Sequence, residues 1–222
     1  MGTSAGSPTC MANVSACFIL GSTERHRTPG KIVVKSAAWI AKYLELQKSA
    51  IERLPHAEIS TVIDLIRSAG EAGRRIFVCG NGGNAANAAH FATDLGKGAS
   101  AVAPRPFKVL SLADNTAWMT AIGNDYAFED VFVRQLENHA EPGDLLILSS
   151  VSGSSPNLVA AARWARQRGL ATVALVGGKR GALAEHADHL LVVDDTHYGR
   201  VEDVQMMMLH MFCYSIMEAS VA

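Results

Sequence analysis

Four side chains of the types that bind metals or move protons lie in two segments of the chain. His90 and Asp94 are four residues apart in an alanine-rich segment, and Glu202 and His210 are eight apart near the C-terminus. If the first segment is helical, His90 and Asp94 share one face with Cβ atoms about 6 Å apart, close enough to share a metal ion or a proton. Glu202 and His210 would lie about 80° out of phase on a helix and could still converge on one object. These residue types and spacings indicate metal or acid–base chemistry.

The same four side chains suit zinc if the two segments converge. Two neutral imidazoles and two carboxylates are zinc ligands and together balance its charge. Each pair alone also has a plainer explanation. His90 and Asp94 could form an ordinary surface contact, and His210, inside the apolar stretch MMMLHMFCY, could be a core histidine bonded to a backbone carbonyl.

Two turns have the composition of anion-binding loops. The first, GNGGNAAN (80–87), follows the apolar run RIFVC. Its glycines allow close approach of the backbone to a ligand, and Asn81 and Asn84 can donate hydrogen bonds at the start of a helix. The turn fits neither the dinucleotide-binding G-x-G-x-x-G pattern nor a Walker loop. A tight turn capped by asparagine is the alternative interpretation.

The second turn, SSVSGSSPN (149–157), follows the apolar run DLLIL. Ser150, Ser152, Ser154 and Ser155 precede Pro156, which suits the first position of a helix. Hydroxyls and free N–H groups then meet at a helix N-terminus, where the helix dipole favours a phosphate group. Simple capping is again the alternative, but two such loops in one chain favour a phosphate site.

The elements that must position these residues alternate between strand and helix. Helical periodicity covers AAWIAKYLELQKSAIERL and AEISTVIDLIRSAGEAG, which Pro55 separates, and VEDVQMMMLHMFCYSIMEA ends the chain. Five apolar runs with helical patterns between most of them predict a doubly wound α/β fold, a five-stranded parallel sheet flanked by helices. The runs are RIFVCG, FKVLSLA, DLLILSS, ATVALVGG and HLLVVDD. In such a sheet, ligands bind beyond the carboxyl ends of the strands.

Composition limits the class of protein. The chain has 222 residues, 49% of them hydrophobic, and a formal net charge of −1. We expect one domain over residues 31–222, preceded by a flexible extension over residues 1–30 that is rich in glycine, serine and threonine. Without a basic stripe or a long apolar segment, neither a nucleic acid nor a membrane is an expected partner. The four cysteines form no C-x-x-C pair, which favours a reducing compartment, the cytoplasm.

Four segments occur in order along the chain: CGNGGNAANAAHFATDL, TAIGNDYAFEDVF, PGDLLILSSVSGSSPN and GRVEDVQMMMLH. Together they resemble the sugar isomerase (SIS) domain family, and within it the phosphoheptose isomerases. The resemblance begins near residue 36 and implies an enzyme that interconverts sedoheptulose 7-phosphate and a heptose 7-phosphate, for nucleotide-activated heptose synthesis. It also implies a homotetramer with active sites between subunits.

Site residues follow from the same resemblance, position by position. The implied substrate-binding residues are Asn81, Gly82, Gly83, Asn84, Asn124, Asp125, Ser150, Val151, Ser152 and Ser155, with the serines gripping the phosphate. The implied zinc ligands are His90, Asp94, Glu202 and His210. Because aldose–ketose isomerisation needs a base between C1 and C2 and an acid at the oxygens, we assign Asp94 and His210 to these roles, with Glu202 as the second candidate base.

The chain departs from the family pattern at four positions. The family usually has Glu, Gln, Ser and Thr where this chain has Asp94, Glu202, Asn84 and Val151. The aspartate withdraws its carboxylate by one methylene, and the added charge of Glu202 would strengthen binding of a divalent cation.

Two other functions remain open at this stage. SIS domains also serve as phosphosugar-sensing regulators and as protein-binding adaptors, and the adaptors lack the histidine and acid positions that this chain keeps. An SIS enzyme acting on a different phosphosugar is the other alternative, because the loops indicate a phosphate and a polyol but not a chain length.

Overall fold

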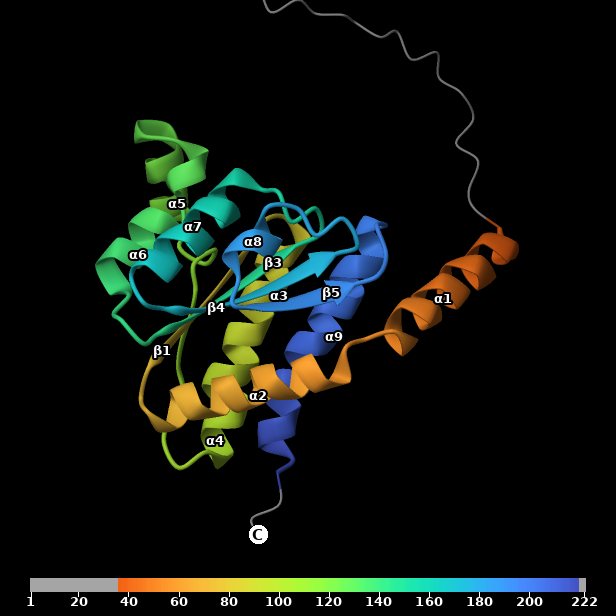
Figure 1. The fold of residues 1–222 in the computed structure, drawn as a ribbon, viewed down its shortest axis with the longest axis horizontal. Coiled ribbons are helices and arrows are strands. Elements are labelled where there is room, and N and C mark those ends of the chain that lie inside the picture. Colours follow the sequence, from red (N-terminus) through yellow and green to blue (C-terminus); the bar gives the residue numbers. More distant parts are fainter. Residues whose placement is uncertain (1–35, 220–222) are drawn as a thin grey trace, which may run out of the picture. The chain divides into compact units, whose positions relative to one another are not determined.

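The fold is built on five parallel strands in the order β2-β1-β3-β4-β5. A computed structural model describes residues 36–219 of the chain. The strands are β1 (Arg75–Gly80), β2 (Lys108–Ser111), β3 (Leu145–Ser150), β4 (Ala171–Gly177) and β5 (His189–Val193). Each strand lies within one of the five predicted apolar runs, so the predicted α/β class and five-stranded parallel sheet are confirmed (Figure 1).

Helices cover both faces of the sheet because side chains alternate along each strand. On β1, Ile76 and Val78 belong to the core beneath α2 and α9, whereas Phe77 and Cys79 belong to the core beneath α6 and α7. Because both faces of the sheet are buried, the strands are continuous apolar runs.

The helices are α1 (Ala37–Glu52), α2 (His56–Glu71), α3 (Gly83–Thr93), α4 (Ser100–Val102), α5 (Thr116–Asp125), α6 (Val133–His139), α7 (Pro156–Gln167), α8 (Leu183–His186) and α9 (Tyr198–Met217). A π-helix, η1 (Asp94–Ala99), continues α3, and a short 3₁₀ turn, η2 (Phe128–Asp130), precedes α6. Within the described part of the chain, no helix is long and apolar enough to cross a membrane.

Helix α1 exposes much of its apolar surface. It packs through a few side chains near the start of α9, where the Gln47 amide donates to the Arg200 carbonyl at 3.3 Å. Trp39, Ile40 and Leu44 stay exposed, at 45%, 52% and 60%. The predicted extension over residues 1–30 lies outside the described residues.

Candidate active site

The two predicted anion-binding loops are neighbours because β1 and β3 are adjacent strands. The chain leaves β1 toward β2 on one side and returns on the other side to form β3, and Gly80 is in register with Ser149. This is the point where strand order reverses, which is where ligands bind in doubly wound sheets. The glycine loop (residues 80–83) and the serine loop (residues 149–155) therefore border one pocket.

That pocket has a volume of about 340 Å³. Its lining includes the predicted residues Asn81, Gly82, Asn84, Ser150, Val151, Ser152 and Ser155, together with Ser149, Leu158, Tyr198 and Glu202. The predicted residue Gly83 is not in the lining but lies beside it, against the carboxylate of Glu202. Asn124 and Asp125 are not part of this lining either. They end α5 with exposed side chains that bond to each other at 2.8 Å, so within one copy of the chain the structure does not bring them to the pocket.

The serine loop has a fixed conformation. The Ser150 hydroxyl accepts a hydrogen bond from the Gly153 N–H at 3.1 Å, and the Ser152 hydroxyl accepts from the Ser154 N–H at 3.2 Å. Gly153 has φ +66°, and a Cβ there would collide with the Arg180 carbonyl in the loop after β4. Only glycine fits at position 153, because the backbone there has a left-handed φ and leaves no room for a Cβ atom. The loop is therefore held at the N-terminus of α7 with its hydroxyls beside the pocket.

One buried hydroxyl of this loop has no protein partner. Ser149 is 1% exposed, and its Oγ makes no hydrogen bond to any of residues 36–219. Leaving a buried hydroxyl unpaired costs about 1–3 kcal/mol. Since Ser149 lines the pocket, a bound ligand or water is the natural partner for it.

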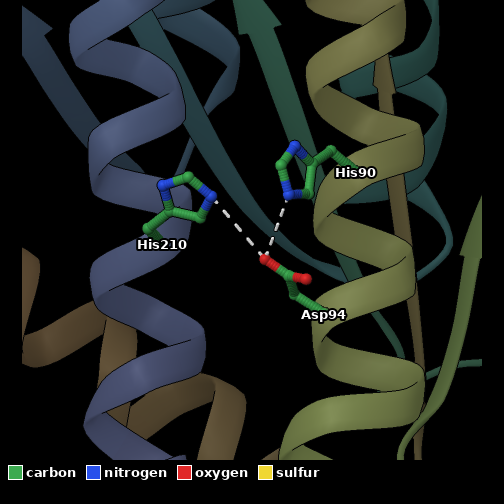
Figure 2. A group of neighbouring side chains, drawn as sticks. All are labelled: His90, Asp94 and His210. Atoms are coloured by element: carbon green, nitrogen blue, oxygen red, sulfur yellow. Dashed lines mark ion pairs between the residues drawn. The ribbon is translucent and has the colours of Figure 1, made fainter.

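Three of the four predicted metal ligands meet between α3 and α9 (Figure 2). Asp94 Oδ2 lies 3.4 Å from His90 Nε2 and 3.7 Å from His210 Nε2. The two imidazole rings stand edge to face with centroids 5.0 Å apart. Each residue offers one ligand atom, and these atoms all lie within 4.8 Å of one another. The three side chains are partly exposed, so an ion or a substrate can reach them.

The backbone changes its winding where this cluster forms. Helix α3 ends at Thr93, and Asp94 is the first residue of the π-helix η1. Such insertions within α-helices are rare and frequently occur at functional sites. Phe91, Leu95 and Ala99 of this segment are buried, and the partly exposed His90 and Asp94 lie beside His210 of α9 (Figure 2).

Glu202, the fourth predicted ligand, does not join this cluster within one copy of the chain. Among residues 36–219, the potential ligand atoms that lie within 4.8 Å of one another belong to His90, Asp94 and His210. Eight residues of helix separate Glu202 from His210 by about 12 Å along α9, and this rise outweighs the modest difference in angle around the helix. The Glu202 carboxylate instead packs against the backbone of Gly83, at the start of α3, and lines the pocket.

Burial changes the ionisation of two groups near these residues. Desolvation, with a smaller contribution from the nearby charge of Asp203, raises the pKa of Glu202 above its ordinary value. Burial, with a smaller contribution from Asp94, raises the pKa of the Cys213 thiol to about 12. Cys213 therefore stays protonated and inert beside the cluster.

A family model for the SIS domain matches residues 38–177. The chain belongs to the SIS domain family. Among its curated relatives, the phosphoheptose isomerase of Nitratidesulfovibrio vulgaris is 37% identical over 185 residues, which cover 82% of this chain and 86% of the relative.

Two solved structures extend the likeness to the fold. The phosphoheptose isomerase of Francisella tularensis superposes with a TM-score of 0.75 at 27% identity, covering 84% of this chain and all of the other. That of Neisseria gonorrhoeae gives 0.74 at 30% identity, covering 82% and 97%. Within the SIS family, this chain therefore groups with the phosphoheptose isomerases.

Several residues of this SIS domain site were not predicted from the sequence. Ser149, Leu158 and Tyr198 line the pocket, and Asn157 contacts Asn81 beside it. Asn157 and Leu158 follow the serine loop directly, and their place in the first turn of α7 is the signal that could have identified them. Tyr198 is brought in by the start of α9, and no local pattern indicates that contact.

Proposed function

We propose that this SIS domain protein is an aldose–ketose isomerase that interconverts sedoheptulose 7-phosphate and a heptose 7-phosphate. One observation carries the proposal: a phosphate-type pocket and a His–Asp–His cluster lie along the same helix. The pocket begins at the N-terminus of α3, and His90 lies seven residues further along that helix, about 10 Å of helical rise. A long phosphosugar can place its phosphate at one end of this path and its reacting carbons at the other.

The serine loop would hold the phosphate. Its hydroxyls at Ser150, Ser152 and Ser155 border the pocket at the N-terminus of α7, where the helix dipole favours an anion. Glu202 lies across the same pocket, and its negative charge would face the hydroxyl groups of the sugar rather than the phosphate. Fixing the phosphate end lowers the entropic cost of aligning C1 and C2 with the catalytic groups.

Asp94 and His210 are our candidates for the proton-transfer pair. The Asp94 carboxylate would carry the proton between C1 and C2, while His210 would protonate and deprotonate the sugar oxygens as the enediolate forms and collapses. Their proximity, 3.7 Å between Asp94 Oδ2 and His210 Nε2, supports action on adjacent atoms of one substrate. Glu202, with its raised pKa, is the second candidate base.

The donor set of the cluster fits a divalent metal. Two imidazoles and one carboxylate within 4.8 Å are the ligands of open catalytic zinc sites, so His90, Asp94 and His210 would hold the ion. When bound, zinc would supply Lewis-acid stabilisation of the negative charge that develops on the sugar oxygens. We therefore propose zinc as the metal cofactor of this site.

Assembly and location complete the proposal. We expect a homotetramer whose active sites are shared between subunits, which would give Asn124 and Asp125 a place at a neighbouring site. The exposed apolar side chains of α1 support assembly. We place the protein in the cytoplasm, consistent with Cys79 and Cys213 being buried free thiols.

A panel of phosphosugars tests the substrate assignment. The purified protein is incubated with five-, six- and seven-carbon aldose and ketose phosphates, and conversion is followed by chromatography. We expect conversion of sedoheptulose 7-phosphate with the highest kcat/KM. Faster conversion of a shorter sugar would reassign the substrate, and no conversion of any sugar would favour a phosphosugar-binding regulator or an adaptor.

A further inference from the structure

Two asparagine side chains connect the glycine loop to the first turn of α7. Asn81 Nδ2 donates to Asn157 Oδ1 at 2.9 Å, and Asn157 Nδ2 donates back to Asn81 Oδ1 at 2.9 Å. Asn157 is 1% exposed, so water cannot easily replace either of these hydrogen bonds. Paired amides of this kind are mutually satisfied and fix each other's orientation.

Asn157 is also fixed from its own helix. Its Oδ1 accepts a second hydrogen bond, from the Leu158 N–H at 3.0 Å. Because only the oxygen can accept, the Asn157 amide cannot flip without losing both bonds, and its NH₂ group must face Asn81. Asn81 in turn keeps one N–H beyond the pair, on a side chain that lines the pocket.

From this geometry we infer that Asn157 is a positioning residue, which acts on the ligand through Asn81. It holds the Asn81 amide ready to donate to a bound phosphosugar and sets the spacing between the glycine loop and the serine loop. Such preorganisation lowers the ordering cost of binding. The inference rests on the proposed function only in taking the pocket as the place where the phosphate end of the substrate binds.

A double-mutant cycle tests the inference with inorganic phosphate as the probe. The Kd for phosphate is measured by calorimetry for the wild type, Asn81→Ala, Asn157→Ala and the double variant, with KM and kcat for sedoheptulose 7-phosphate measured alongside. We expect each single change to raise the phosphate Kd and the KM about tenfold, the scale of losing one well-placed hydrogen bond. Because Asn157 acts through Asn81, the double variant should match Asn81→Ala within about twofold.

Two further variants serve as a replacement and as a control in this experiment. Asn157→Ser is one atom shorter than asparagine and cannot reach Asn81, and it replaces Asn157→Ala in the cycle if that variant does not fold. Asn138→Ala removes an exposed amide that donates only to its own helix, at the Arg134 carbonyl, and should leave Kd and KM unchanged.

Additive effects, with the double variant near a hundredfold, would overturn the inference, as would an unchanged Kd for Asn157→Ala. If Asn157 had a purely structural role, Asn157→Ala would lower the unfolding temperature. Its effect on the phosphate Kd would then be the same whether or not the Asn81 side chain is present. Phosphate binding needs no turnover. A wild type that binds phosphate with a coupled cycle but isomerises no sugar would therefore refute the proposed function and leave this inference standing.

Discussion

At the scale of single residues, the cluster of His90, Asp94 and His210 leads to a prediction about metal content. Zinc should remain bound through purification, at about one ion per chain. Removing either imidazole leaves two ligands, too few for a stable zinc site. His90→Ala and His210→Ala should therefore lower both metal content and kcat, whereas Ser152→Ala should mainly raise KM. Elemental analysis of the purified wild type and variants measures the zinc content. A fully active wild type without zinc would contradict the metal site and leave Asp94 and His210 with acid–base roles alone.

Glu202 gives a second prediction at this scale, in which stability and activity separate. Burial raises the pKa of Glu202 in the folded state above its ordinary value of 4.5. Above about pH 4.5, the Glu202 carboxyl group therefore loses its proton more readily in the unfolded chain than in the folded protein, and this destabilises the folded state. Glu202→Gln should raise the unfolding temperature at neutral pH, and the gain should vanish below about pH 4.5. If Asp94 is the base, kcat should fall by less than about tenfold, because loss of a general base costs about 10²–10⁴.

Thermal unfolding followed across pH, together with steady-state kinetics, measures both effects of Glu202→Gln. Glu137→Gln, a matched change of an exposed glutamate on α6, is the control and should alter neither. A drop in kcat of a hundredfold or more would transfer the role of base from Asp94 to Glu202.

The residues with catalytic or ligand chemistry were easier to predict from the sequence than the way in which they group in space. The four-residue spacing of His90 and Asp94 is a local property of one helix, and their proximity was predictable. Whether Glu202 or only His210 meets them depends on how α9 packs along α3 and on the axial distance between turns. The pairing of Asn81 with Asn157, 76 residues apart in sequence, depends on the glycine loop and the first turn of α7 meeting beyond the carboxyl ends of β1 and β3, and no local pattern encodes it.

At the scale of elements, the serine loop depends on a backbone conformation that only glycine adopts easily. Gly153→Ala should destabilise the fold by more than about 2 kcal/mol, because it adds a steric collision with the Arg180 carbonyl to the cost of about 1–2 kcal/mol for a left-handed residue. It should also weaken phosphate binding. Gly169→Ala is the matched control, with φ +75° and no close neighbour beyond the Pro142 side chain at 3.7 Å.

Urea unfolding and phosphate titration of both glycine variants separate strain from collision. Gly169→Ala should show the smaller loss of stability and unchanged phosphate affinity. Equal losses in the two variants would mean that the contact between the serine loop and the loop after β4 contributes nothing beyond strain.

The strands were the most predictable elements. Buried parallel strands are continuous apolar runs, so RIFVCG coincides with β1 and HLLVVDD contains β5. The π-helix at Asp94 was not predictable in this way, because an inserted residue leaves the local composition unchanged.

At the scale of the whole molecule, exposed apolar side chains on α1 predict assembly. Ile40 and Leu44 are four residues apart on one helical face and are 52% and 60% exposed, a patch that a second subunit would cover. The wild type should sediment as a tetramer at micromolar concentration, and Leu44→Glu should shift it to smaller species. Lys42→Ala, about 200° around the helix from Leu44, should not. A monomeric wild type would contradict the assembly.

The central claim is that the phosphate pocket and the His–Asp–His cluster form one isomerase site, and solvent proton exchange tests it most directly. Sedoheptulose 7-phosphate is incubated with the protein in D₂O, and deuterium at C1 and C2 of the recovered sugars is followed by NMR. Proton transfer through an enediolate predicts incorporation at these carbons alone, lowered at least about 10²-fold in Asp94→Asn and retained in Asn138→Ala. Absence of deuterium from these carbons with the wild type, or an unchanged rate in Asp94→Asn, would contradict the account.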